Sequence, residues 1–209
     1  YDILGHGKTP LDKDNLSFDD FSNQLINLIN HLKFKKIHLV GFSIGSLIAR
    51  NFATRFDDRL KSLTLLCSIF DRTDAQQKLV NERFEKTKTE NKLTKDALKR
   101  WFNEDYLIKN PEVSEKIISI LNDNNMENFI KIYSLFVNHQ DTENFKNIKT
   151  KTLVITGEGD VGSTPEMSEK LSKKIENSTL KIISVGKHLC SIECSDDVNI
   201  TLKNHFQNA

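Results

Sequence analysis

Short apolar runs alternate along the chain with segments whose apolar residues recur every three or four positions. The first pattern is typical of strands buried on both faces of a sheet, and the second is typical of amphipathic helices. A helix is expected to begin at Ser17, where a capping serine and acidic residues precede the periodic positions. The expected strands are 36–40, 63–66, 152–156 and 180–185.

The order of these segments predicts an α/β protein with a mostly parallel sheet covered on both faces. The first two expected strands and the helical segment between them form a βαβ unit. From 71 to 147 the charge rises, glycine disappears and the apolar residues take helical spacing. We therefore expect a core formed by 1–70 and 148–209, with a helical cap at 71–147 over the C-terminal edge of the strands, where open sheets bind ligands. A last helix is expected from about Ser195.

Composition and charge exclude several classes of partner. A chain of 209 residues can form one domain with an inserted part, and its formal net charge of +1 predicts neither a nucleic-acid partner nor an electrostatic membrane partner. No stretch resembles a signal peptide or a membrane-spanning helix. The three cysteines are odd in number and lack metal-ligand spacing. We expect a protein of the reducing cytoplasm that needs no metal and no cofactor.

The pentapeptide Gly41-Phe42-Ser43-Ile44-Gly45 joins an expected strand to an expected helix. Gly-x-Ser-x-Gly in this setting is typical of a nucleophile elbow, in which a strained turn raises the serine above the sheet and flanking glycines avoid Cβ clashes. The alternative is an ordinary strand-to-helix turn, but the apolar strand before it and the periodic helix after it favour the elbow. Ser43 is therefore the candidate nucleophile.

A serine hydroxyl becomes a good nucleophile only beside a general base, which in turn needs an acid to orient it. Asp160 and His188 each follow an expected strand. Because the carboxyl ends of parallel strands meet at one edge of a sheet, we predict that Asp160 orients His188 and that His188 is the base for Ser43. Asp71 or Asp74, which follow another expected strand, are the alternative acids.

The order of Ser43, Asp160 and His188, each after a strand, resembles the α/β-hydrolase family. Residues 2–9 resemble the Asp-x-x-Gly-His-Gly-x-Ser segment that follows the fourth strand of family members. The resemblance implies the α/β-hydrolase fold with a helical cap after the sixth strand. The N–H of Ile44, at the start of the helix after the elbow, is then one donor of the oxyanion hole.

Within this family, the segments 100–101, 157–167 and 188–193 are most similar to 3-oxoadipate enol-lactonases and related small esterases. The similarity implies that Arg100 binds a carboxylate of the substrate and that Trp101 forms an aromatic wall. The alternative is a solvated helix face at Arg100 with Trp101 packed inside the cap.

Together, these features predict a serine hydrolase that cleaves a small carboxylic ester or an enol-lactone through an acyl-enzyme. Cofactor-free haloperoxidases, thioesterases and carbon–carbon bond hydrolases share the same three residues, and the sequence does not separate them. Dehalogenases and epoxide hydrolases of the family carry aspartate at the elbow, so Ser43 argues against both. The alternative outside the enzymes is a binding protein with the same fold and no catalytic activity.

By the same resemblance, the chain opens at about the fourth strand, after the loop that supplies the second oxyanion donor. We therefore expect an N-terminally incomplete sheet that a longer polypeptide, a separate segment or a second copy of the chain completes. Four other residues have structural interpretations: a loop-stabilising carboxylate at Asp2, a cavity-wall histidine at His6, a structural histidine at His38 and a small buried side chain at Cys190.

Overall fold

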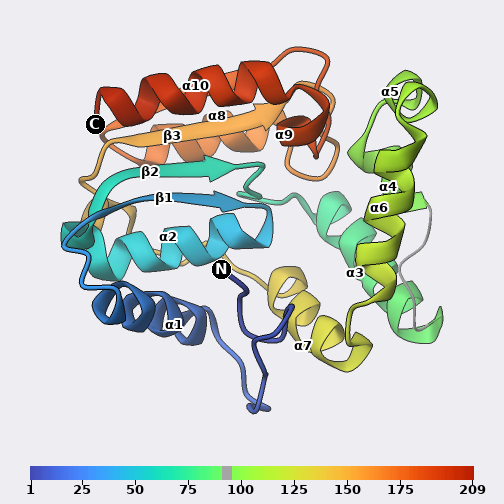
Figure 1. Cartoon of the computed structure of the whole chain (residues 1–209), viewed down its shortest axis with the longest axis horizontal. Coiled ribbons are helices and arrows are strands. Elements are labelled where there is room, and N and C mark those ends of the chain that lie inside the picture. The colour runs from blue at the N-terminus through green and yellow to red at the C-terminus, as the bar shows by residue number, and fades with distance from the viewer. Residues whose placement is uncertain (91–95) are drawn as a thin grey trace.

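The computed structural model describes residues 1–90 and 96–209, and its described strands form one parallel sheet in the order β1-β2-β3-β4 (Figure 1). The core elements are α1 (Phe18–His31), β1 (Ile37–Phe42), α2 (Ile44–Phe56), η1 (Asp57–Arg59), β2 (Leu60–Leu66), β3 (Thr152–Gly157), α8 (Pro165–Lys174), β4 (Ser178–Ile183), α9 (Cys190–Glu193) and α10 (Ser195–Gln207). Each predicted strand is present. The strand predicted at 180–185 begins and ends two residues earlier, because β4 pairs with β3 from Ser178 to Ile183.

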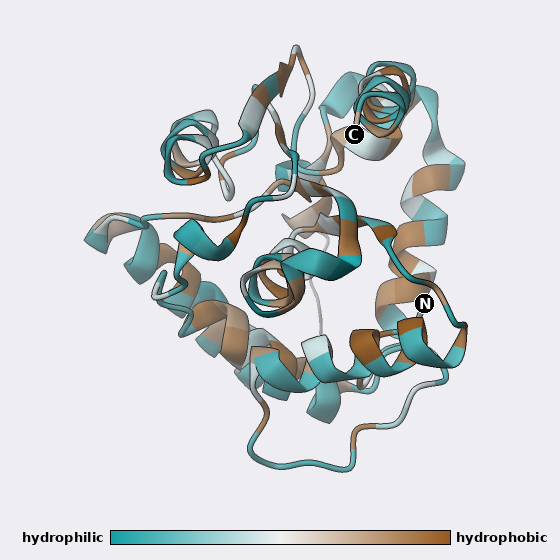
Figure 2. Ribbon diagram, turned by 90° about the vertical axis from the view of Figure 1, so that its left-hand side faces the viewer, coloured by the Kyte–Doolittle hydropathy of each residue, from teal (hydrophilic) through white to brown (hydrophobic). Residues whose placement is uncertain are grey.

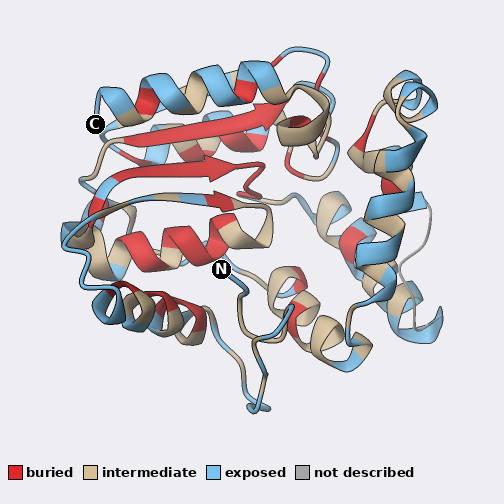
Figure 3. Cartoon of the chain, viewed as in Figure 1, coloured by how far each residue is buried: buried red, intermediate tan, exposed pale blue. Residues whose placement is uncertain are grey.

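Helices cover the sheet on both faces, as the continuous apolar runs predict (Figure 2). Successive side chains of a strand point to opposite faces. Leu65 of β2 accordingly packs in a cluster with α1, α2 and α8, whereas Leu66 packs with Val198 of α10. Figure 3 shows the buried strand β3 at the centre of this arrangement. The α/β fold with helices on both faces is thus confirmed.

The first strand, β1, lies at one end of the described sheet and is covered less completely than its neighbours. Ile37 and Leu39 pack against the cluster that contains α2, while His38 and Val40 are exposed on the opposite face. His38 has the structural role predicted for it, because its Nδ1 lies 2.7 Å from the hydroxyl of Ser62 on β2. This contact joins β1 to β2 through side chains as well as backbone.

Residues 1–17 contain neither a helix nor a strand. Asp2 stabilises the loop as predicted, since its carboxylate accepts the N–H of Lys8 at 2.9 Å. Gly7 has a φ of 54°, and a Cβ there would lie 2.2 Å from Oδ2 of Asp2. Glycine therefore makes room for that carboxylate.

The segment between β2 and β3 is helical. Its elements are α3 (Asp74–Glu90), α4 (Asp96–Trp101), α5 (Glu104–Lys109), α6 (Pro111–Asn122), α7 (Met126–Val137) and η2 (Phe145–Asn147). In Figure 1, α3 to α6 lie beyond the arrowheads of the strands, at the edge where parallel sheets bind ligands. Helix α3 packs against α7. Among the described residues, no helix is both long enough and apolar enough to cross a bilayer.

A buried arginine on α2 connects both ends of this helical segment to the core. The guanidinium of Arg50, fully buried, donates to the carbonyl of Ile69 at 2.8 Å, just before the segment. It also donates to the carboxylates of Asp141 at 2.6 Å and Glu143 at 2.9 Å, which lie between α7 and η2 near the end of the segment. The cation therefore bridges two stretches of chain that are far apart in sequence.

This cluster gives the protein a specific sensitivity to acid. Burial alone would raise the pKa of Asp141, but His139 and Arg50 hold it well below its usual value of 3.8. The folded protein thus favours the ionised carboxylate. Its contribution to stability is complete above about pH 4, where the unfolded chain is also ionised, and is lost as the pH falls toward the folded-state pKa.

We expect Asp141→Asn to lower the free energy of unfolding by about 3 kcal/mol at pH 7, because the charge of Arg50 loses a partner. At pH 3 the difference from the wild type should be clearly smaller. Urea denaturation at pH 7, 5 and 3 measures the free energy of unfolding. The control is Asp12→Asn, which removes a carboxylate from an exposed position. An equal loss at all three pH values would contradict the role assigned to the ionised carboxylate.

Candidate active site

Ser43 occupies a strained turn between β1 and α2. Its φ of 54° and ψ of −119° lie in a region that residues other than glycine rarely adopt. The N–H of Ser43 donates to the carbonyl of Leu66 at 2.9 Å, and the hydroxyl of Ser46 donates to the carbonyl of Ser43. These hydrogen bonds hold the turn against the end of β2. This is the geometry of the predicted nucleophile elbow.

Of the two glycines that flank the elbow, steric contact requires only Gly41. A Cβ on Gly41 would lie 2.2 Å from the carbonyl oxygen of Gly45 and 2.7 Å from Cβ of Ala49. A Cβ on Gly45 would meet none of the described atoms beyond its own helical turn within 4 Å. The prediction that both glycines avoid clashes is therefore wrong for Gly45, because its Cβ direction points into open space.

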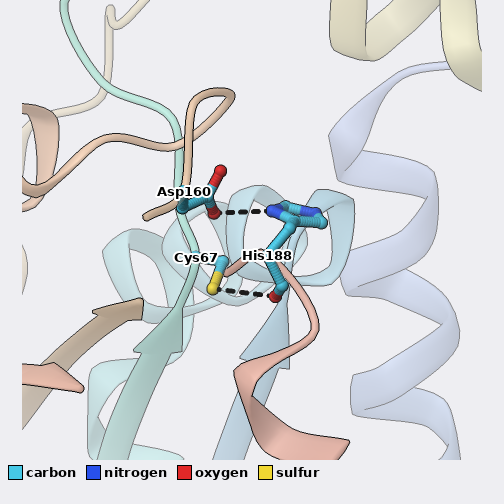
Figure 4. Close-up of side chains that lie close together, drawn as sticks. All are labelled: Cys67, Asp160 and His188. Carbon is cyan, nitrogen blue, oxygen red and sulfur yellow. Dashed lines mark hydrogen bonds and ion pairs between the residues drawn. The ribbon is translucent and has the colours of Figure 1, made fainter. Parts of the chain in front are cut away.

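His188 lies between Asp160 and Ser43. Its Nδ1 is 2.7 Å from Oδ2 of Asp160, and its Nε2 is 3.1 Å from the hydroxyl oxygen of Ser43. The other oxygen of Asp160 accepts the N–H groups of Gly162 at 2.8 Å and Ser163 at 2.9 Å. The carboxylate is therefore held in place with one oxygen free for the imidazole (Figure 4). The structure brings together all three residues predicted to form the catalytic triad.

Gly157 allows the loops that carry the acid and the histidine to cross closely. A Cβ on Gly157, at the end of β3, would lie 2.3 Å from the carbonyl oxygen of Gly186 and 2.4 Å from that of Lys187. The loop after β4 can thus pass directly over the end of β3. This crossing places His188 within reach of Asp160.

The alternative acids lie away from the histidine. Asp71 is exposed and accepts a hydrogen bond from Lys170 at 3.0 Å. Asp74 begins α3 and lines a separate hollow on the surface of that helix. The contact of 2.7 Å to His188 therefore distinguishes Asp160 from both.

The backbone N–H of Ile44 is placed beside the nucleophile. Ile44 is the first residue of α2, and the first N–H groups of a helix have no acceptor within it. The positive end of the helix dipole lies at the same point. Ile44 also lines the cavity described next, so the position of its N–H suits the predicted oxyanion donor.

A cavity of about 330 Å³ opens onto Ser43 and His188 beneath the cap helices. The predicted substrate-binding residues Arg100 and Trp101 both line it, and the Trp101 ring centroid lies 6.5 Å from that of His188. Trp101 is thus not packed away inside the cap. Arg100 is half-buried in the cavity wall. His6 also lines the cavity, as predicted.

Two thiols pack next to the loop that carries His188, between β4 and α9. The S–H of Cys67 donates to the carbonyl of His188 at 3.2 Å (Figure 4). The sulfur of Cys67 also lies 3.9 Å from that of Cys190. Cys190 and burial raise the pKa of Cys67 well above its usual value, so Cys67 is a neutral thiol at pH 7. Cys190 is fully buried, as predicted. The sequence analysis did not identify Cys67, whose neighbours are set by the fold.

Two groups of side chains have the residue types of a metal site. The first contains Cys67, Asp160 and His188. Its thiol is protonated, and its carboxylate and imidazole already bond to each other. The second contains His139, Asp141 and Glu143. Its carboxylates already bind the guanidinium of Arg50, whose positive charge opposes a metal cation. Neither group of described residues fits a metal ion as it stands.

The cap contacts the His188 loop and the helix α9 that follows it, through hydrogen bonds that the sequence analysis missed. The carboxylate of Glu193 accepts hydrogen bonds from the N–H of Asn103 at 2.9 Å and from its side-chain amide at 2.6 Å. The N–H of Leu189 donates to the carbonyl of Trp101 at 3.0 Å. No local pattern reveals these pairs, because the partners are separated by about 90 positions.

Residues 1–193 match the family described as alpha/beta hydrolase fold, and the chain belongs to that family. The (E)-2-((N-methylformamido)methylene)succinate hydrolase of Acinetobacter baylyi is 26% identical over 95% of this chain and 75% of its own length. The 3-oxoadipate enol-lactonase 2 of the same species is 22% identical over 92% of this chain and 72% of its own length. The crystal structure of the enol-lactonase from Burkholderia xenovorans LB400 superposes with a TM-score of 0.90, at 23% identity, over 99% of this chain and 79% of that one. The predicted family is thus confirmed.

The unequal roles of the elbow glycines lead to a direct test. We expect Gly41→Ala to lower the free energy of unfolding by roughly 1 to 3 kcal/mol, because the added methyl group overlaps α2. Gly45→Ala is the matched change at the other end of the elbow and should leave stability equal or slightly higher. Urea denaturation of both variants measures the difference. A larger loss for Gly45→Ala would contradict the steric argument.

Proposed function

We propose that this protein is a serine hydrolase that cleaves a small carboxylic ester or a lactone. The observation that carries the proposal is the chain of contacts from Asp160 through His188 to Ser43, at 2.7 and 3.1 Å, at the end of a cavity. Membership of the α/β-hydrolase family supports it. The names of two relatives, both 3-oxoadipate enol-lactonases, support the same chemistry.

In this reaction the imidazole of His188 works as the base and then as the acid. Its Nδ1–H donates to Asp160, which leaves the lone pair of Nε2 facing Ser43. As the serine oxygen bonds to the ester carbonyl carbon, Nε2 accepts the hydroxyl proton, and the carbonyl oxygen becomes an oxyanion. The N–H of Ile44 stabilises that charge where it develops. Collapse of the intermediate breaks the bond to the leaving oxygen, which takes the proton from Nε2.

Water completes the cycle by the same route. His188 accepts a proton from water as the water oxygen bonds to the acyl carbon, and Ser43 then leaves with that proton. Asp160 remains ionised throughout and stabilises the imidazolium. The products are the free acid and the alcohol, or a single hydroxy or keto acid from a lactone.

Arg100 and Trp101 support a substrate that carries a carboxylate. Both line the cavity that contains Ser43, and the guanidinium of Arg100 donates within the described residues only to the carbonyl of Asp96, at 3.1 Å. Its remaining N–H groups have no acceptor in the part of the chain that the structure describes and can donate to an anion, which a guanidinium binds through two parallel hydrogen bonds. An aromatic wall at Trp101 then covers the apolar part of the acyl group.

The nucleophile is tested by intact mass spectrometry after treatment with a fluorophosphonate probe. We expect one adduct on the 24.0 kDa chain and none on Ser43→Ala. Ser114→Ala, which changes a serine of α6 outside the cavity, is the control and should react as the wild type does. Labelling that persists in Ser43→Ala would overturn the assignment. A chain that never reacts and turns over no ester would favour the non-catalytic binding protein.

The role of Arg100 is tested with p-nitrophenyl butyrate, which is neutral, and mono-p-nitrophenyl glutarate, which carries one carboxylate. We expect Arg100→Gln to lower the ratio of kcat/KM for the anionic ester to that for the neutral ester by about tenfold to a hundredfold. Lys99→Gln removes the same charge from the neighbouring exposed residue of α4, outside the cavity. A loss of equal size in both variants would show a general electrostatic effect and contradict direct binding.

A further inference from the structure

The cavity above Ser43 contains positive charge that its own wall does not balance. The cations among its described lining residues are Arg83 and Lys86 of α3 and Arg100 of α4. Lys86 lies 3.6 Å from the carboxylate of Asp96, so that lysine is paired. The other acidic residue in the lining already bonds to the catalytic histidine. Two guanidinium groups remain.

Neither guanidinium has a carboxylate partner within residues 1–90 and 96–209. Residues 91–95 contain no aspartate or glutamate. The side chain of Arg83 donates no hydrogen bond to the residues that the structure describes, and Arg100 donates only to a backbone carbonyl. Elsewhere in the described structure, Arg50 has two carboxylate partners, and Arg72 donates to the carbonyls of Phe136 and Val137, so the chain itself supplies acceptors to both of these guanidinium groups.

The two guanidinium groups act on the same region of the cavity. Burial lowers the pKa of Arg100 and the positive charge of Arg83 lowers it further, against an opposite effect of the Asp96 carboxylate, so the two cations repel each other. Both also act on Tyr133 of α7, which lines the same cavity. The ring of Tyr133 is held edge-on against Phe84 of α3 at 5.4 Å. The packing of α3 against α7 thus fixes the wall from which Arg83 projects.

We propose that Arg83 and Arg100 form a two-guanidinium subsite, and that the substrate carries two carboxylates in addition to the bond that Ser43 attacks. This inference rests on the proposed ester or lactone hydrolysis and narrows its substrate class. A guanidinium matches one carboxylate through paired hydrogen bonds. A substrate with one carboxylate leaves one half-buried cation without a partner, whereas a substrate with two neutralises both and removes their repulsion. A cavity of about 330 Å³ is large enough for an acyl group of this kind.

A binding experiment tests the subsite without depending on catalysis. The ligands are the mono-N-phenyl amides of butyric, glutaric and propane-1,2,3-tricarboxylic acid, which carry zero, one and two free carboxylates. Their affinities for the Ser43→Ala protein are measured by calorimetry. We expect affinity to rise with each carboxylate, and Arg83→Gln in that background to weaken binding of the dicarboxylate by about tenfold or more. The effect on the ligand with one carboxylate should be smaller.

Two further variants separate direct binding from other effects. Arg83→Lys keeps the charge without the forked donor geometry and should lose less affinity than Arg83→Gln. Lys78→Gln removes a charge from the exposed part of the same helix, outside the cavity, and should bind the dicarboxylate as the parent does. Equal losses for Lys78→Gln and Arg83→Gln, or no preference for the dicarboxylate, would overturn the subsite.

A kinetic experiment with the p-nitrophenyl esters of the same acids distinguishes failure of this inference from failure of the proposed function. We expect Arg83→Gln to raise KM for the ester with two carboxylates more than it lowers kcat, because the subsite is remote from the reacting bond. If the esters are hydrolysed but the second carboxylate brings no advantage, the subsite is wrong and the hydrolase stands. If no ester is hydrolysed while Arg83 still governs dicarboxylate binding, the hydrolase is wrong and the subsite stands.

Discussion

The close approach of α2 to the end of β1 at Gly41 sets the positions of Ser43 and of the N–H of Ile44. Because a Cβ at Gly41 would overlap the carbonyl of Gly45, the helix can start this close only where that side chain is missing. The turn then forces Ser43 to a φ of 54° and starts α2 at Ile44, which lines the cavity. A single steric contact thus links the strain at the serine to the position of the N–H of Ile44.

The same helix connects this site to the cap. Ser43 precedes the first turn of α2, and Arg50 lies at the middle of the helix, where it binds the chain before α3 and again between α7 and η2. Asn103 of the cap also binds Glu193 of α9, the short helix that directly follows the His188 loop. The helices that form the cavity wall are therefore held against both the serine and the histidine, although they come from an insertion between two strands.

Charge is distributed very differently in the core and in the cavity. Arg50 is buried and has two carboxylate partners, so its charge serves the fold. Arg83 and Arg100 face the cavity without such partners among the described residues. Burying an unpaired cation costs free energy, and a fold retains such a group most readily where a ligand supplies the missing anion. This contrast is the physical basis for the anionic substrate that we propose.

The sequence by itself determined the strands, the elbow and the order of Ser43, Asp160 and His188 along the chain. Apolar runs and helical spacing are local signals, and the parallel order of the strands brings the residues after them to one edge of the sheet. Only the tertiary structure decided that Gly45 is not required by sterics, that Arg50 joins two distant stretches, and that Arg83 shares a cavity with Arg100. The partners of Arg50 lie 91 and 93 positions away along the chain. Such contacts depend on how helices pack in three dimensions, and no periodicity within a segment records them.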